Sequence, residues 1–562
     1  MSKFNLLDEP WISVVTDYKG KTELVSLREF FQNAHNYIDL AGDMPTQDFA
    51  VLRFLLAILH TVFSRYDANG DVYEWIDVND RMQQVENVDE EDEEEYEDAL
   101  MDTWKNLWEA GKFPDIIVKY LEAWHDRFYL FDDDYPFYQV NEKDIEPSKL
   151  NKGSPTSIFG KNINRTISES SNKISIFSPK FGENDNKEKL NYAQATRWIL
   201  MYQSYTGLSD KVIFGKEKYK ASKGWLFDLG GIYTSYNNLF KTLLLNLRLI
   251  NNTDSHYNYS IQKPCWELTP NEVLENRFYS GQIDNIAELY TVWSRALYIS
   301  DFNEGDVFKM DIVKLPDISH EDQFLEPMTI WRYNDSGEYK NHFTPRKHQF
   351  NKSMWRSFGL ITLNEASFDG NKNNPKRKPG IIEWLNFIDS NIKDKNIVIN
   401  AISMEDDGNA TSWVPTNEIA DKMLIEAAIL NDLNDKGWVY VINDVVEETK
   451  ETVDEIFRSF LNKIRDIRNL EATDFTTNHI EKLYFKIDKP FRDWLSGIDY
   501  HDSKNDKINT WKEELKTIVI GEANQIIKNS SQRDFTGRVV NDSMMNIATA
   551  FNSFMSRINK KL

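Results

Sequence analysis

Apolar stripes at helical spacing after residue 413 constrain the fold of this 562-residue chain more than any other feature. Their members recur at three- and four-residue steps, which places them on one face of a helix. Short polar segments separate the stripes, and a helix with one apolar face buries that face against a neighbour. The pattern predicts an antiparallel helical bundle over residues 413–562. The stripes are Ile419, Met423, Ala427 and Leu430; Val453, Ile456, Phe457, Phe460 and Ile464; Ile480, Leu483, Ile487, Phe491 and Trp494; Ile508, Trp511, Leu515, Ile518 and Ile526; and Met544, Ile547, Phe551, Phe554 and Ile558.

The first 412 residues mix extended and helical patterns. WISVV (11–15) and TELVSL flank a Lys-Gly pair that is typical of a hairpin turn. An apolar stripe from Phe49 to Phe63 predicts a buried helix, which Thr46 can cap. FKMDIVKL and NIVINAIS look like strands. We therefore expect an α+β protein, with a large mixed α/β domain over residues 1–412 followed by a C-terminal four-helix bundle over 413–562.

Composition excludes several protein classes. Hydrophobic residues make up 41% of the chain, which fits a folded protein. The sequence contains no run of about 18 apolar residues, so we expect no membrane-spanning helix. The N-terminus lacks the pattern of a signal peptide, so we expect none there. The single cysteine, Cys265, cannot form an internal disulfide, so we expect a cytoplasmic protein. The nine histidines are scattered, and we expect neither a metal site nor a cofactor.

Charge is distributed unevenly along the chain. The net charge is −24, yet residues 151–224 hold 13 Lys+Arg against six Asp+Glu, and residues 340–380 hold nine against two. Each island therefore carries +7 within an otherwise acidic protein. Two such islands point to a focused anion site rather than to indiscriminate DNA binding. That lysine-rich loops merely keep the surface soluble remains an equally good interpretation of either island.

Two loops within the first island have the chemistry of nucleic-acid contacts. KVIFGKEKYKASKG (211–224) follows Gly207 and combines glycines with lysines. Lysines and backbone N–H groups bind phosphate, and glycine lets the backbone come close. In IFSPKFG (176–182), an aromatic ring stands beside polar groups and can stack on bases. The candidate residues are Gly207, Lys211, Gly215 and Lys216 in the first loop, and Ile176, Phe177, Ser178 and Lys180 in the second.

Signals for catalysis are weak. The chain has no P-loop, no GxGxxG and no GxSxG motif. Cys265 has no histidine near it in sequence and is better explained as a buried thiol. The His501-Asp502 pair lies in an interhelical turn without further ligands. We expect no enzymatic activity; a hydrolase that uses scattered carboxylates with His501 and Asp502 stays as a competing hypothesis.

The N-terminal residues carry a more specific signal. FNLLDEPWISV (4–14) and VSLREFFQNAHNYIDLAGDMPTQDFAVLRFLLAILH (25–60) resemble the CasA family, the large subunit of the type I-E CRISPR effector complex Cascade. The resemblance is strongest over the first 65 residues and continues more weakly to the terminal helices. It implies a large mixed domain followed by a four-helix bundle, and a protein that is not a nuclease.

The resemblance also implies a function and a set of partners. Family members recognise the protospacer-adjacent motif in double-stranded target DNA and help to open the duplex and form the R-loop. They lie near the 5′ region of the CRISPR RNA, beside the small helical subunit and the backbone subunits. They also provide a docking surface for the helicase-nuclease. A purely structural capping subunit that touches no bases is the alternative.

Several family elements correspond to positions in this chain. A flexible nucleic-acid loop matches SIFSPK, and a glycine loop matches TGLSDKVIFGK, although the glycine-rich run of some relatives is absent. A wedge that splits the first base pair matches the hairpin-like DDGNATSW (406–413), where Asn409 replaces the glutamine of some relatives. The implied wedge residues are Gly408, Asn409 and Ala410, and the implied minor-groove lysine is Lys309 or Lys314.

Overall fold

The computed structural model describes residues 2–163, 188–251, 254–279, 283–364, 375–392, 395–470, 474–540 and 543–562. The chain divides into two compact units. Unit 1 comprises residues 1–348, 365–384 and 400–420, and unit 2 comprises 349–364, 385–399 and 421–562. A mixed helix-and-sheet region followed by a helical region is confirmed. The predicted domain boundary after residue 412 stays a prediction.

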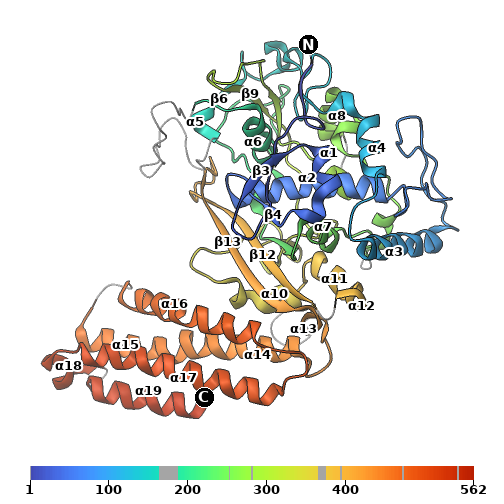
Figure 1. Ribbon diagram of the computed structural model, residues 1–562. Helices are drawn as coiled ribbons and strands as arrows, with labels where there is room; N and C mark the ends of the chain where they lie inside the picture. Colours follow the sequence, from blue (N-terminus) through green and yellow to red (C-terminus); the bar gives the residue numbers. More distant parts are fainter. Residues whose placement is uncertain are drawn as a thin grey trace. The chain divides into compact units, whose positions relative to one another are not determined.

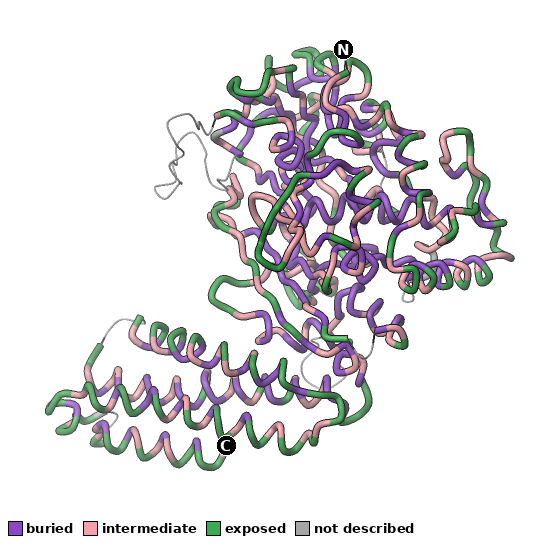
Figure 2. The backbone as a smooth tube through the Cα atoms, in the orientation of Figure 1, coloured by how far each residue is buried: buried purple, intermediate pink, exposed green. Residues whose placement is uncertain are grey.

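Helix α2 (Pro45–Phe63) forms the centre of unit 1 and confirms the predicted buried helix. It is buried on nearly all sides (Figure 2), and α6 (Tyr192–Ser204) and α9 (Ile286–Tyr290) pack against it. Within the described residues, α2 alone is long and apolar enough to cross a membrane by length and composition, a test that core helices also pass. The predicted cap was wrong: Met44 stands at the N-cap without a side-chain bond, and Thr46 lies in the first turn.

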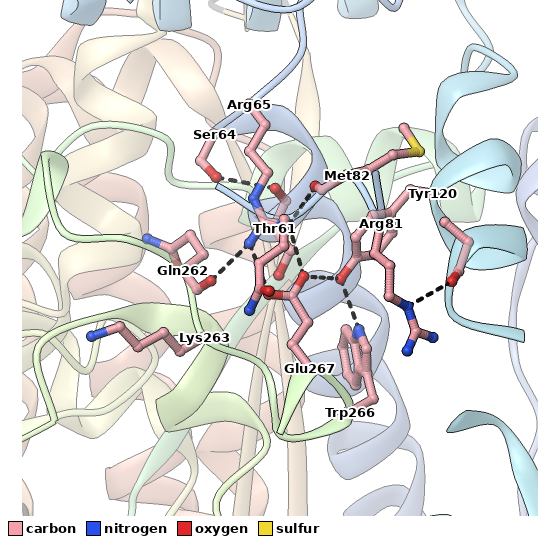
Figure 3. Close-up of polar contacts among 12 residues, drawn as sticks. Thr61, Ser64, Arg65, Arg81, Met82, Tyr120, Gln262, Lys263, Trp266 and Glu267 are labelled. Carbon is pink, nitrogen blue, oxygen red and sulfur yellow. Dashed lines mark hydrogen bonds and ion pairs between the residues drawn. The ribbon is translucent and has the colours of Figure 1, made fainter. Parts of the chain in front are cut away.

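Two buried arginines from the α2 segment hold carboxylates of unit 1. Arg53 binds Glu326 with both nitrogens at 2.8 and 2.7 Å. Arg65 follows the helix and binds Glu267, whose Oε1 also accepts from the Tyr120 hydroxyl at 2.6 Å (Figure 3). The carbonyls of Met82 and Gln262 also accept from this guanidinium, at 2.9 Å each, while its buried Nε has no partner among the described residues. Because a buried charge is costly unless it is paired and hydrogen-bonded, these contacts fix the elements around α2.

Three-stranded sheets form much of unit 1, although residues 396–399 and 421–426 of the third sheet are assigned to unit 2. Strands β2 (Ile12–Val15) and β3 (Thr22–Val25) pair as the predicted hairpin, with β4 (Asp39–Leu40) on the other side of β2. A second sheet has the order β6-β9-β8, and a third the order β13-β12-β7. Their strands are β6 (Thr156–Phe159), β8 (Arg295–Tyr298), β9 (Lys309–Lys314), β7 (Gly231–Ser235), β12 (Asn396–Asp406) and β13 (Pro415–Glu426).

Shorter elements surround these sheets and α2 (Figure 1). Two further strand pairs are β1 with β5 and β10 with β11. The bounds are β1 Lys3–Asn5, β5 Tyr129–Phe131, β10 Trp331–Tyr333, β11 Phe343–Pro345, α1 Leu27–Asn33, α3 Glu93–Ala110, α4 Ile116–Ala123, α5 Gly160–Ile163, α7 Leu239–Asn246, α8 Pro270–Tyr279 and α11 Gly380–Phe387.

Four long helical segments run side by side in unit 2 (Figure 1). The first is α14 (Trp438–Glu451), which passes through a π-helical turn (Thr452–Phe457) into α15 (Arg458–Arg468). Most residues of the predicted stripes are buried between these segments, but Ile508, Ile518 and Phe551 are only half-buried, and Val519 is buried in place of Ile518. The ring centres of Phe491 and Trp511 lie 5.0 Å apart. The other helices are α16 Asp474–Ser496, α17 Lys504–Lys528 and α19 Ile547–Lys561; short elements are α10 Phe358–Thr362, α12 Asp389–Ile392, α13 Ala427–Asn431, α18 Gln532–Thr536, β14 Arg538–Val540 and β15 Ser543–Met545.

Two of the predicted helical stripes began too early, because their first residues lie on strands. Ile419 and Met423 lie on strand β13, where Met423 and Ile425 are buried and Leu424 between them is exposed. This two-residue alternation is that of a strand, and a short apolar run does not distinguish it from a helix. Met544 lies on β15 and is 62% exposed, because α19 begins only at Ile547.

The buried pair of Arg65 and Glu267 yields a stability prediction. Glu267→Ala leaves the Arg65 guanidinium buried without its carboxylate, and we expect a loss of about 3–5 kcal/mol in the free energy of unfolding. Urea denaturation measures this loss. The exposed pair of Lys489 and Asp493 is the control: Asp493→Ala should cost less than about 1 kcal/mol. Equal losses in the two variants would contradict this account of the core.

Candidate nucleic-acid interface

The glycine loop, defined here as residues 205–224, leaves the end of α6 and returns to it. Thr206 and Gly207 both donate their backbone N–H to the Lys223 carbonyl, at 2.9 and 3.2 Å. Gly224 has a φ of +92°, and a Cβ there would lie 2.3 Å from the Ser204 carbonyl oxygen. Only glycine therefore allows the two ends of the loop to lie this close.

A buried arginine also binds the glycine loop through hydrogen bonds. Arg295, on β8, donates to the carbonyls of Gly207 and Ser222 at 2.7 Å each, and to Asp210 Oδ1 at 2.9 Å. Lys314, at the end of β9, donates to the Leu208 carbonyl at 3.0 Å. Both cations thus hold the first turn of the loop onto the β6-β9-β8 sheet.

The tip between β12 and β13 (residues 407–414, the hairpin tip) is a closed turn. Asp407 N–H donates to the Val414 carbonyl at 3.0 Å. Asn409 Oδ1 accepts from the N–H of Thr411 at 3.1 Å and from its hydroxyl at 2.8 Å. Gly408 has a φ of +66° with open space around it. The implied wedge residues Gly408, Asn409 and Ala410 are all exposed.

The glycine loop and the hairpin tip touch through their backbones. Leu208 N–H donates to the Ser412 carbonyl at 2.7 Å. Gly207 has a φ of +68°, and a Cβ there would lie 2.4 Å from the Trp413 carbonyl oxygen. The structure therefore brings two elements that lie about 200 residues apart in sequence into one continuous surface, which the sequence did not show.

Alternating charges surround this junction. Lys223 Nζ lies 2.6 Å from Asp228, and Lys347 Nζ lies 2.7 Å from Asp406, the last residue of β12. Both ammonium groups also lie near the ring of Phe227, Lys223 Nζ at 5.3 Å and Lys347 Nζ at 4.0 Å from its centre. Burial lowers the pKa of Lys347, although the two carboxylates oppose this shift. These lysines neutralise acids and hold the hairpin; they are not free for phosphate.

The base of β13 is anchored to α2. Glu418 Oε2 accepts from Thr46 N–H at 3.1 Å and from the Thr46 hydroxyl at 2.9 Å. Met44 gives α2 no side-chain cap, so Glu418 supplies an acceptor to the unsatisfied first turn. Burial raises the pKa of the Glu418 carboxyl. Burial also raises the pKa of Asp48, two residues after Thr46 in the first turn of α2, to about 7. The DMPTQ segment of the sequence thus positions the hairpin.

The outer part of the glycine loop presents free lysines. Lys211, Lys216 and Lys218 are exposed and make no ion pair within the described residues. Lys220 differs, because its Nζ lies 3.2 Å from Asp317 and 3.1 Å from the Tyr339 hydroxyl. Gly215 has a φ of +77°, and a Cβ added there would meet no atom within 4 Å. Three of the predicted lysines are therefore exposed where an anion could reach them, and their role as a phosphate site stays a prediction.

Lys309 does not lie at this junction. It is the first residue of β9 and pairs with Asp311 at 3.0 Å, whereas Lys314 at the other end bonds the glycine loop. Lys309 and Lys314 are five residue steps apart along β9, which corresponds to about 17 Å. Lys309 instead faces Phe159 across the β6–β9 ladder. The candidate residues Ile176, Phe177, Ser178 and Lys180 lie outside the described residues.

The groups weighed for catalysis are engaged in the fold. Burial raises the pKa of the Cys265 thiol to about 12, which leaves it protonated. Asp502 accepts from the Asp499 N–H, and Lys507 lies 2.9 Å from it. Among the residues that the structure describes, no group of three or more His, Cys, Asp or Glu side chains is arranged to hold a metal ion.

Comparisons with known proteins agree on one family. Residues 5–521 match the profile of the family "CRISPR-associated protein Cse1". The chain is 27% identical over 370 residues to the CasA/Cse1 protein of Thermus thermophilus, a match that covers 64% of this chain and only 60% of that relative.

Solved structures share the fold over the full length. The crystal structure of Thermobifida fusca Cse1 superposes with a TM-score of 0.77 at 21% identity, covering 100% of this chain and 98% of the other. A chain of a solved "CRISPR RNA-guided surveillance complex" superposes with a TM-score of 0.66 at 14% identity, covering 100% of both. At these identities, the likeness establishes the fold.

Proposed function

Because this chain belongs to the CRISPR-associated Cse1 family, also named CasA, we propose that it is a non-catalytic subunit of a CRISPR RNA-guided surveillance complex that reads the motif beside the target in double-stranded DNA. The family that residues 4–60 suggested is thereby confirmed. In the proposal, the glycine loop lies against the motif duplex, and the hairpin tip enters the duplex beside it and starts unwinding.

One observation carries this proposal: the contact between the glycine loop and the hairpin tip. The hydrogen bond from Leu208 N–H to the Ser412 carbonyl and the close approach of Gly207 to Trp413 join the two loops into one continuous surface. A reader of DNA needs donors at fixed spacing and free cations beside them. The exposed amide of Asn409 supplies a hydrogen-bond donor, and Lys211, Lys216 and Lys218 supply the cations.

The hairpin tip has the properties of a wedge. Its turn is closed by its own hydrogen bonds, and Glu418 and Asp406 anchor the two strands below it. Ala410 is a small apolar group at the exposed apex. Apolar groups inserted between base steps partly unstack them at a cost of a few kcal/mol, roughly. Pairing of the guide with the target strand then approximately offsets the duplex that is opened.

The remaining partners follow from the same assignment. A subunit beside the motif lies near the 5′ region of the CRISPR RNA and contacts the small helical and backbone subunits. The opened duplex must then be handed to a helicase-nuclease, for which this chain offers a docking surface. A cytoplasmic location fits these partners. A capping subunit without base contacts is the second candidate, and the exposed Nδ2 group of Asn409, which makes no hydrogen bond among the described residues, argues against it.

Target binding by the complex, assembled with and without this chain, tests the proposal. Guide-matched duplexes that differ only in the adjacent motif are the substrates, and Asn409→Ala is the first variant. We expect discrimination between motifs only when the chain is present, and we expect Asn409→Ala to reduce it about threefold or more, the effect of removing one hydrogen bond. Discrimination that persists without the chain would contradict the proposal.

The free lysines yield a second prediction. Lys216→Gln removes an unpaired cation, and we expect weaker target capture and a shallower salt slope (log affinity against log salt). The slope should change by roughly 0.9 for each phosphate that the variant no longer neutralises. Lys220→Gln is the matched control, because Lys220 already pairs with Asp317. Binding titrations between low and moderate salt measure both slopes. Identical slopes in wild type and Lys216→Gln would show that this loop does not bind phosphate.

A further inference from the structure

Two N–H groups at the hairpin tip have hydrogens that no acceptor among the described residues takes up. The Thr411 backbone N–H can only donate, so the Asn409 atom that it meets is Oδ1, and Nδ2 is left without a partner. Trp413 is half-buried, its indole Nε1 makes no hydrogen bond in this part of the chain, and the atom is not enclosed. Both groups therefore face solvent as donors.

The carboxylates of the tip, in contrast, are already used. Asp406 accepts from the Gly408 N–H at 2.9 Å and from Lys347 at 2.7 Å. Asp407 accepts from two backbone N–H groups of the turn, at 3.1 and 3.2 Å. The acidic side chains thus point into the turn and stabilise it. The polar hydrogens of Asn409 Nδ2 and Trp413 Nε1, in contrast, have no acceptor among the described residues, and this suits a partner that presents acceptors.

Trp413 also has a backbone conformation that is rare for a large side chain. Its φ is +44°, in the left-handed region that favours glycine. Neighbours hold it there: Gly207 packs against its carbonyl, and Lys223 Nζ lies 4.7 Å from the centre of its ring. A bulky residue kept in a costly conformation by its surroundings is a physical pointer to function.

We infer that Trp413 is a further nucleic-acid contact, whose indole N–H donates to an acceptor on the minor-groove edge of the motif duplex. This inference rests on the proposed function. Every base pair presents purine N3 and pyrimidine O2 acceptors in the minor groove, and guanine adds an N2 donor. Tryptophan can only donate, so Trp413 suits these acceptors and opposes guanine N2. The ammonium group of Lys223 holds the ring from one side and leaves its edge for the groove.

Trp413→Phe in the fully assembled complex tests this inference, because it keeps an aromatic ring for Lys223 and removes the indole N–H. Target duplexes carry a 3-deazapurine, which lacks the N3 acceptor, at one motif position at a time. We expect Trp413→Phe to weaken motif-dependent binding about 2- to 10-fold. At one position, the deazapurine should weaken wild type by a similar factor and leave the variant unchanged.

Two controls separate the possible outcomes. Trp75→Phe changes another half-buried indole that makes no hydrogen bond among the described residues, and it should leave binding unchanged. Equal losses of binding affinity in wild type and Trp413→Phe at every deazapurine position would overturn the inference. It would also be overturned if Trp413→Phe weakened binding equally to duplexes with and without the motif. If Asn409→Ala still reduces motif discrimination in that case, the proposed function stands and the role of Trp413 alone is rejected.

Discussion

The buried guanidinium of Arg295 holds the candidate interface together. It is fully buried, and it binds carbonyls at both ends of the glycine loop as well as the carboxylate of Asp210. Removing one partner of such a buried pair typically costs about 3–5 kcal/mol, because the remaining charge has no water to solvate it. The first turn of the loop is therefore as fixed as the sheet beneath it. The exposed lysines of the outer loop, from Lys211 to Lys218, depend on this base.

The hairpin tip depends on the glycine loop in turn. The tip meets it through a backbone hydrogen bond and through Gly207, while the strands below are held by Lys347 and by Thr46 at the start of α2. Lys223 and Lys347 at this junction are neutralised by acids, whereas Lys211, Lys216 and Lys218 on the outer loop make no ion pair within the described residues. An acidic protein can in this way present a local phosphate site without attracting nucleic acid over its whole surface.

Sequence patterns predicted the elements better than their meeting points. The stripe from Phe49 to Phe63 predicted α2, and the turn-forming DDGN predicted the hairpin tip, because periodicity and turn chemistry are local. The strand at Ile419 was mistaken for a helix, since β13 alternates clearly only near its end. The contact of Gly207 with Trp413, and the pairing of Lys220 with Asp317, join distant parts of the chain, so no local pattern could predict them. The residue pattern that pointed toward this junction was the pair of basic islands, the second of which includes Lys347.

The central claim is that the glycine loop and the hairpin tip read DNA as one surface, and Gly207→Ala tests it most directly. Its Cβ would lie 2.4 Å from the Trp413 carbonyl oxygen, whereas Gly215→Ala adds a Cβ in open space at a similarly positive φ. Discrimination between motifs by the assembled complex is the measurement. The account predicts that Gly207→Ala lowers discrimination about tenfold or more and that Gly215→Ala retains it, with both chains incorporated equally. Unchanged discrimination in Gly207→Ala would contradict the account.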